Sequence, residues 1–559
     1  MRAFQRDAAA ALLVDGEIVT AAQEERFTKK AHDPAFPKRA IRYCLDEAGI
    51  LGRDLDHVVF YEKPLRKFER LLAQELRAFP RSAKIFAGTM FVWLGDRLWL
   101  KSSIAEDVGV DSDRILFTEH ASAHAAHAFY SSPFDEAGVL CVDDVGEWAT
   151  TLLASGSGAK LETLAELRLP HSLGLFASAI TQFLGFEPGT QESSVEALVP
   201  YGKPRFAEAL AALIPARPGG AFEVDETPFR FAFDSDVLFG KDLAGVLGEH
   251  RTPGATLRMS ADDSRDADVA ASLQQVMEQR VLALATELAG RVESRNLCFA
   301  GLLAGNARLC ARLAAEGPFD ALHVAAEPGK AGAAIGAALY AHHQLGGAAR
   351  SGVTGRSAVF VGEALGEPEE GAQAFESSAA AQADLCQRLL KQETCAWVRG
   401  RMEFARQALG HRSILADPRP EGARGKLLGA VQRSEAHLPC SLAVPAESAA
   451  DWFELPAGCE TLTARALLSV QAKQSAAQHA GSALEPDGRV RILCVDAAED
   501  PEFHALLVRF GESSGAPLLL HADYALRGSP LVRSEVDALE AFERSALDAL
   551  YVEDHVYTR

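Results

Sequence analysis

The chain has 559 residues, of which 48% are hydrophobic, and a net charge of −21 at pH 7. That length suffices for three or four domain-sized units, and the acidic balance argues against a nucleic-acid or anionic-membrane partner. No uncharged apolar run reaches the roughly 18 residues that a membrane helix needs. Arg6-Asp7 interrupts the first apolar stretch, which argues against a signal peptide, and nine scattered cysteines without a CxxC pair are typical of a cytoplasmic protein.

Short strands alternate with helices in the first half of the chain. The Asp15-Gly16 turn between two apolar runs predicts a β-hairpin over residues 8–22. Helical periodicity predicts helices over 37–48, 67–76, 86–100, 173–184, 268–289 and 331–343. Short apolar runs predict strands over 58–61, 138–142 and 296–300.

A stretch rich in Gly, Ala and Ser, 346–355, predicts a linker, which we extend over 346–370. It would separate a domain over 1–345 from a second domain over 371–559. In the second domain the patterns predict helices over 372–390 and 465–480, and strands over 395–398 and 489–495.

A candidate metal site lies between residues 116 and 151. His120 and His124 are four residues apart on a predicted helix, so both imidazoles can reach one point. Asp143 follows the predicted strand 138–142, and its carboxylate would complete a His/His/Asp site for a divalent ion. The alternative is a surface helix that is simply rich in Ala and His.

Several long strings carry a family resemblance. They include DGEIVTAAQEERFTKKAHDPAFPKRAIRYCL, YEKPLRKFERLL, VDDVGEWATT, PHSLGLFASAITQFLGF and GRMEFARQALGHRSILADPR. In these strings the chain resembles the O-carbamoyltransferases of antibiotic and nodulation-factor biosynthesis, over nearly its whole length.

The resemblance implies an α/β fold in two parts. The first is a duplicated actin/hexokinase-like (ribonuclease-H-like) domain over 1–345, and the second is an α/β domain over 371–559 that resembles the carbamoyl-adenylate-forming fold. In this family the second domain makes carbamoyl-adenylate from carbamoyl phosphate and ATP. The first domain uses a metal, typically iron, and moves the carbamoyl group to a hydroxyl of a small-molecule acceptor.

The resemblance also identifies departures at the implied metal site. Arg6 stands where the family has a His as general base, and a guanidinium cannot lose a proton near neutral pH. Lys330 replaces the fourth metal ligand beside His120, His124 and Asp143, and Asp144 replaces a Gly. We expect the Lys330 ammonium to take the place of the metal and to pair with Asp143 or Asp144. The alternative is that Lys330 points to solvent and the site is empty.

The positions that the resemblance assigns to nucleotide and carbamoyl binding are partly kept. The residues that match are Gly301, Asn306, Gly329, Gly332, Arg401, Glu403, Arg412, Ser413 and Arg527. The residues that depart, mostly by losing a cation, are Ser194, Glu196, Leu302, Gln407, Gln432, Ser434 and Leu438. Hydrogen bonds to charged groups contribute about 1.5–3 kcal/mol each, so losing three or four would weaken carbamoyl phosphate binding by roughly a thousandfold or more.

Three functions remain open from the sequence. The first is an active carbamoyltransferase of specialised metabolism. The second is a catalytically impaired paralogue that serves as a binding partner of an active family member. The third is an altered enzyme that uses the retained cleft. In each case the expected location is cytoplasmic, without nucleic acid or membrane as a partner, and the expected ligands are ATP and a small molecule.

Overall fold

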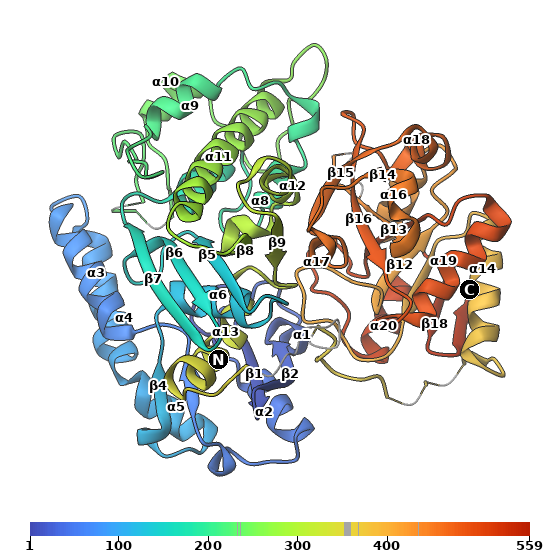
Figure 1. Cartoon of the computed structure of the whole chain (residues 1–559), viewed down its shortest axis with the longest axis horizontal. Helices are drawn as coiled ribbons and strands as arrows, with labels where there is room; N and C mark the ends of the chain where they lie inside the picture. Colours follow the sequence, from blue (N-terminus) through green and yellow to red (C-terminus); the bar gives the residue numbers. More distant parts are fainter. Residues whose placement is uncertain are drawn as a thin grey trace.

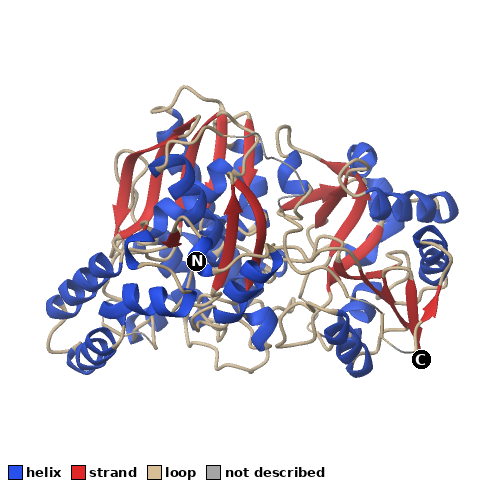
Figure 2. Cartoon of the chain, turned by 90° about the horizontal axis from the view of Figure 1, so that it is seen from below, coloured by secondary structure: helices blue, strands red, loops and turns tan. Residues whose placement is uncertain are grey.

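The computed structural model describes residues 1–559 except 232, 235, 351–358, 367, 370, 434 and 436. Part of the predicted linker and Ser434 therefore lie outside the described residues. The described chain is α/β, with two groups of strands that lie side by side and are each covered by helices (Figures 1 and 2). In the part of the chain that is described, no helix is both long and apolar enough to cross a membrane.

A five-stranded sheet in the order β7-β6-β5-β8-β9 forms the centre of the first half. Its strands are β5 (Glu136–Val142), β6 (Ala149–Ser157), β7 (Lys160–Arg168), β8 (Asn296–Ala300) and β9 (Ala321–Val324). β5 pairs antiparallel with β6 and parallel with β8. Alternate residues of β5 enter two different cores, Val139 and Cys141 against helix α6 (His120–Tyr130), and Leu140 and Val142 on the side of helix α11 (Arg265–Ala289).

The pairing order of this sheet recurs near the start of the chain. Strands β1 (Ala9–Val14) and β2 (Glu17–Gln23) form the predicted hairpin, and β3 (Val58–Phe60) pairs parallel with β4 (Ile115–Phe117). Residues 1–3 join the two pairs: Arg2 bridges Ala9 in antiparallel fashion, and the Met1 nitrogen lies 2.8 Å from the Val59 oxygen. The resulting order, β2-β1-(1–3)-β3-β4, matches β7-β6-β5-β8-β9.

Helices cover both groups of strands in the first half. Next to the hairpin are α1 (Glu25–Thr28), α2 (Lys38–Glu47) and α13 (Ala333–Leu339), and α13 packs between α6 and β1. The remaining helices are α3 (Pro64–Arg77), α4 (Ala83–Gly95), α5 (Leu100–Val108), α7 (Leu173–Phe183), α8 (Glu192–Glu196), α9 (Ala207–Leu213), α10 (Lys241–Leu247) and α12 (Ala307–Glu316).

The second half contains one ten-stranded sheet in the order β10-β19-β18-β11-β12-β17-β13-β16-β15-β14. Its strands are β10 (Gln373–Ala374), β11 (Cys395–Val398), β12 (Arg412–Ala416), β13 (Ser441–Pro445), β14 (Phe453–Glu454), β15 (Leu468–Ala472), β16 (Arg489–Val495), β17 (Leu519–Asp523), β18 (Ala549–Val552) and β19 (His555–Thr558). Its helices are α14 (Ser378–Leu390), α15 (Ala423–Ala430), α16 (Ala449–Trp452), α17 (Glu460–Thr463), α18 (Gln474–Ala480), α19 (Pro501–Ser514) and α20 (Glu535–Arg544).

Two predicted helices in this half begin later than expected. The helix predicted over 465–480 is wrong in its first part, where β15 (Leu468–Ala472) pairs with β16; α18 follows only at Gln474. The run LSVQA (Leu468–Ala472) is short, and its first three residues are buried. Pairing within the sheet therefore determines its conformation, and the local helical pattern does not. The helix predicted over 372–390 begins at Ser378, capped by the Ser377 hydroxyl, because residues 373–374 pair with β19.

The two halves contact each other along β9 and α12. The Leu322 nitrogen donates to the Gly458 oxygen at 2.8 Å, and Arg465 donates to the Val324 oxygen at 2.8 Å. Arg308 on α12 pairs with Asp487 at 2.7 Å. These contacts bring residues near the ends of β8 and β9 next to the loops of the second half.

Candidate functional site

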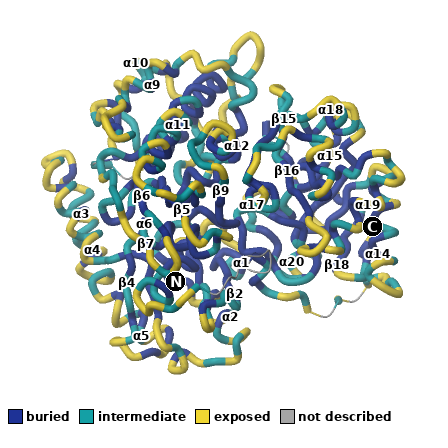
Figure 3. The backbone as a smooth tube through the Cα atoms, in the orientation of Figure 1, coloured by how far each residue is buried: buried dark blue, intermediate teal, exposed yellow. Residues whose placement is uncertain are grey.

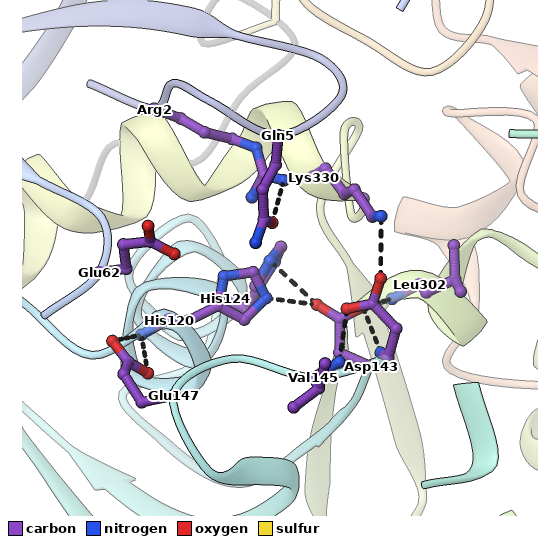
Figure 4. Close-up of polar contacts among 12 residues, drawn as sticks. Arg2, Gln5, Glu62, His120, His124, Asp143, Val145, Glu147, Leu302 and Lys330 are labelled. Carbon is purple, nitrogen blue, oxygen red and sulfur yellow. Dashed lines mark hydrogen bonds and ion pairs between the residues drawn. The ribbon is translucent and has the colours of Figure 1, made fainter. Parts of the chain in front are cut away.

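The three predicted metal ligands lie together in the first half (Figure 4). His120 and His124 occupy successive turns of α6, and Asp143 follows the end of β5. Asp143 Oδ2 lies 2.9 Å from His120 Nε2 and 3.2 Å from His124 Nε2. All three side chains are buried, and their ligand atoms lie within 4.8 Å of one another. The helical spacing therefore places two imidazoles on one carboxylate, as the sequence predicted.

The protonation states of this cluster follow from its burial. Burial lowers the pKa of His124 well below its usual 6.5. Burial opposes ionisation of Asp143, but the hydrogen bond from His120 and the nearby charges outweigh it and hold the pKa of Asp143 well below 3.8. A neutral His124 next to a charged Asp143 is the donor set that a divalent ion requires.

Lys330 lies beside this cluster and is buried, with 9% of its surface exposed. Its Nζ is 2.9 Å from Asp144 Oδ2 (Figure 4). Burial opposes the charge on Lys330, yet the Asp144 carboxylate keeps the pKa of Lys330 above its usual 10.5. The predicted ion pair is thus confirmed with Asp144 as the partner, and the alternative, a lysine in solvent, is wrong.

These residues fit a metal only in part. The Nε2 atom of His124 lies 3.2 Å from Asp143 Oδ2 but makes no hydrogen bond among the described residues, so the imidazole and the carboxylate face one point that an ion could occupy. The position of the fourth ligand, however, carries an ammonium, which donates no lone pair and repels a cation. His120, His124 and Asp143 could hold an ion, but the complete four-ligand site of the family is not formed.

Arg6 comes close to Lys330 from the other side. A Cβ at Gly189 would lie 3.5 Å from Arg6 Nη1 and 3.6 Å from Lys330 Nζ, so both cations meet at this turn. Arg6 donates to the Pro188 oxygen and to Thr190 Oγ1, and pairs with Glu187 at 2.7 Å. The residue at the family's base position is therefore a cation that is bound to the 187–190 turn.

Sequence reasoning missed two groups near this site. Arg2 is fully buried and lies 4.6 Å over the Tyr61 ring, and it adds a third cation to the same corner (Figure 4). Asp7, Glu25 and His32 form a second His/carboxylate cluster, with Asp7 Oδ1 2.7 Å from His32 Nδ1. No spacing in the sequence signals either group, because their members come from different elements.

A second cavity, of about 160 Å³, lies where the two halves meet. Three arginines reach its wall, and each is paired inside the protein. Arg433 lies 3.7 Å from Asp523, Arg491 lies 3.6 Å from Glu196, and Arg308 pairs with Glu485 and Asp487.

Two of the residues that replace family cations, Gln407 and Leu438, also line this cavity. Gln407 accepts a hydrogen bond from Arg491 at 2.8 Å and donates to the Arg465 oxygen at 3.0 Å. Leu438 contributes an apolar side chain to the wall. Gln432 faces away and donates to the Arg544 oxygen at 2.8 Å. The wall thus presents carboxylates next to each cation, which disfavours a phosphate anion.

The positions that match the family have local structural partners. Arg412 is fully buried and donates to backbone oxygens, including that of Arg399 at 2.7 Å. Glu403 accepts from the Leu409 nitrogen at 2.7 Å, and Ser413 Oγ lies 2.8 Å from His521 Nε2. Arg401 pairs with Glu47, and Arg527 pairs with Glu435, both at 2.7 Å. Of these five, none lines the interdomain cavity, although His521 does.

The matching glycines and Asn306 shape the backbone near Asp143. Gly301 has φ +88°, and a Cβ there would lie 2.5 Å from the Val142 oxygen. Leu302 next to it donates its N–H to Asp143 Oδ1 at 3.3 Å. Gly329 and Gly332 pack against Glu327 on either side of Lys330. Asn306 caps α12, with its Oδ1 accepting from the Leu309 nitrogen at 2.8 Å.

Fold and site define a two-part α/β protein with a buried His/His/Asp cluster and a polar cavity between its halves. A family model for the carbamoyltransferase N-terminus matches residues 1–339, and one for the carbamoyltransferase C-terminus matches residues 386–559. The chain belongs to the carbamoyltransferase family.

Relatives extend over the whole chain. It is 35% identical to the uncharacterized protein sll1178 of Synechocystis, over 100% of this chain and 96% of that protein. It is 29% identical to nodulation protein NolNO of Sinorhizobium fredii, over 98% of this chain and 78% of that protein. Nodulation protein NolO of Bradyrhizobium diazoefficiens is 28% identical over 78% of this chain and 77% of its own length.

Proposed function

We propose that this chain is a catalytically impaired carbamoyltransferase relative, which keeps the His/His/Asp cluster and a cavity between its halves but does not form carbamoyl-adenylate at an enzymatic rate. The observation that carries the proposal is the 2.9 Å ion pair between the buried Lys330 and the partly buried Asp144, next to His120 and His124. The protein's own cation supplies the charge that a metal would supply in the family.

The first half lacks two groups that carbamoyl transfer to a hydroxyl needs. A general base must accept the hydroxyl proton, and Arg6, which donates to the 187–190 turn, cannot accept one. A Lewis acid would activate the carbamoyl group, and the ammonium of Lys330 only donates hydrogen bonds. His120, whose imidazole lies against Asp143, is the nearest remaining group that could take a proton.

The cavity between the halves favours a different ligand from carbamoyl phosphate. Each arginine on its wall has a carboxylate partner, so a phosphate would have to displace Asp523 from Arg433 or Glu196 from Arg491. A neutral or zwitterionic polar molecule can bind without displacing either pair. ATP remains a candidate ligand through backbone contacts near Gly301 and Gly329.

The finer fold assignment is also part of this proposal. The repeated order of pairing, β2-β1-(1–3)-β3-β4 and β7-β6-β5-β8-β9, supports an actin/hexokinase-like duplication in the first half. The mixed ten-stranded sheet of the second half is proposed to correspond to the carbamoyl-adenylate-forming domain.

A second candidate function is supported by the His/His/Asp cluster itself. Three buried ligand atoms within 4.8 Å remain assembled, which favours an altered enzyme that binds an ion at three ligands. Under this hypothesis His120, His124 and Asp143 would serve a chemistry different from that of the family. An active family paralogue is the partner expected under the first proposal.

One assay tests the first proposal. The full chain is incubated with ATP and carbamoyl phosphate, and carbamoyl-phosphate-dependent exchange of pyrophosphate into ATP is measured. We expect exchange far below the ~1–10³ s⁻¹ typical of enzymes. The control is the variant Glu162→Gln, which breaks an exposed ion pair far from both clefts. Exchange at an enzymatic rate in the unmodified chain would refute the proposal and favour an active transferase.

A further inference from the structure

Helices α3 and α4 form a hairpin at the edge of the first half, on the side opposite the second half (Figure 1). Seven of the thirteen large apolar side chains that are exposed in the described chain lie within residues 65–99: Leu65, Leu76, Phe79, Phe91, Val92, Leu94 and Trp99. Phe91 is 84% exposed and Trp99 is 64% exposed. Figure 3 shows this hairpin mostly in the colours of exposed and intermediate residues.

Helix α4 is as apolar in composition as a buried helix, but most of its residues are exposed or only partly buried. Residues 85–95, IFAGTMFVWLG, contain no charged side chain, yet only Trp93 in α4 is buried. Trp93 stacks on Phe68 at 5.3 Å, and Thr89 donates to Glu75 at 2.6 Å, so one edge of α4 is packed against α3. A helix that is apolar on all sides is normally covered, so the rest of α4 lacks a cover within this chain.

The charge of this region is opposite to that of the whole protein. Residues 63–101 contain nine basic and three acidic side chains, and four of the basic ones pair with carboxylates outside this range: Lys63 and Arg66 with Glu119, Lys67 with Glu62, and Arg77 with Glu226. Among the described residues, Arg81, Lys84 and Lys101 are exposed and have no carboxylate partner, in a chain of net charge −21. The basic residues flank the apolar run: Arg81 and Lys84 precede it, and Arg97 and Lys101 follow it. Lys84 and Lys101 are exposed.

We propose that the α3–α4 hairpin binds the surface of an anionic lipid bilayer. The exposed Phe91 and Trp99 would enter the boundary between headgroups and acyl chains, while Lys84 and Lys101 would contact lipid phosphates. With 13 residues α4 is about 20 Å long, shorter than the ~30 Å hydrocarbon core, so it would lie in the interface and not span it. The expectation of no membrane partner rested on the net charge of the whole chain, which conceals this local surplus.

Charge complementarity also favours an anionic bilayer over a second copy of the chain as the partner of this hairpin. Two hairpins facing each other would bring the unpaired, exposed Arg81, Lys84 and Lys101 of both copies together around an apolar contact. An anionic bilayer compensates those charges and covers the apolar side chains in the same contact.

The test is co-sedimentation of the full chain with vesicles. One set contains equal parts of phosphatidylcholine and phosphatidylglycerol, and the other contains phosphatidylcholine alone. We expect binding to the anionic vesicles and a loss of about tenfold or more for the double variant Phe91→Ser/Leu94→Ser. Lys84→Glu/Lys101→Glu should lose binding at low salt, and high salt should weaken the binding of the unmodified chain. The matched control, Val508→Ser/Val536→Ser, changes two exposed apolar residues of α19 and α20 and should bind normally.

Three outcomes would overturn the proposal: no binding to anionic vesicles, equal binding to both vesicle types, or equal loss in the control variant. Analytical ultracentrifugation of the lipid-free chain tests whether a second copy of the chain covers the hairpin. A dimer that dissociates in Phe91→Ser/Leu94→Ser, without lipid binding, would assign the hairpin to a second copy instead.

Discussion

The region around Lys330 and the interdomain cavity both contain cations that are paired with carboxylates of the chain, but the two regions differ in how far these pairs are exposed to solvent. In both, a cation that could attract an anionic ligand or replace a metal is paired with a carboxylate of the chain. Lys330 is buried and lies 2.9 Å from Asp144, whose side chain is 17% exposed, whereas the side chains of Arg433 and Asp523 are each 29% exposed and lie 3.7 Å apart. A buried pair is costly to break, while a partly exposed pair can exchange one partner for a ligand. The Lys330–Asp144 pair is therefore expected to exclude a metal at all ligand concentrations. In the cavity, a carboxylate of the chain competes with an anionic ligand, which can displace it when it binds tightly enough.

Replacing Lys330 should give the largest effect, because it removes one partner of a buried pair. Lys330→Met leaves Asp144 without its ion-pair partner and should lower the free energy of unfolding by about 3–5 kcal/mol. Urea denaturation measures the change. The control Lys160→Met removes an exposed partner of Glu162 and should cost less than about 1 kcal/mol.

The double variant Lys330→Met/Asp144→Gly sharpens this test. It also removes the carboxylate left unpaired, so part of the loss should be recovered, with a coupling of about 0.5–3 kcal/mol. Additive effects within error would mean that the two side chains do not stabilise each other.

In the cavity, a carboxylate rather than a cation is the group to remove. Glu196→Gln frees Arg491, and carbamoyl phosphate should then bind roughly tenfold more tightly than in the unmodified chain. Calorimetry measures both dissociation constants, with Glu162→Gln as the surface control. An affinity unchanged by Glu196→Gln would show that Arg491 does not face the ligand.

Protonation of buried histidines should make the first half sensitive to acid. Burial, with a contribution from Arg465, lowers the pKa of His127 from 6.5 to about 3. The unfolded chain then binds a proton that the folded chain excludes, so stability falls by about 1.4 kcal/mol per pH unit as the pH drops from about 6.5 towards 3. Denaturation at several pH values should show a shallower slope for His127→Gln, and an unchanged slope would contradict the shift.

Local patterns predicted much of the site and several elements. The i, i+4 spacing of His120 and His124 and the strand before Asp143 were sufficient to bring the cluster together. The strands over 296–300, 395–398 and 489–495 occur at their predicted residues, because each is a short apolar run at the centre of a sheet.

Long-range pairing and exposure could not be predicted in this way. Glu196 and Arg491 meet across the two halves, and no local rule connects them. Likewise α4 and α7 are both apolar helices, but α7 is almost wholly buried and α4 is largely exposed. Composition alone does not distinguish a core helix from an uncovered one, since the difference lies in what packs around it.

The central claim, that the Lys330 ammonium has replaced the metal, is tested most directly by elemental analysis of the purified chain and of Lys330→Asp. The account predicts iron and zinc well below one equivalent in the unmodified chain. It predicts a clear gain in Lys330→Asp, where His120, His124 and Asp143 acquire a fourth ligand. A full equivalent of transition metal in the unmodified chain would contradict the claim.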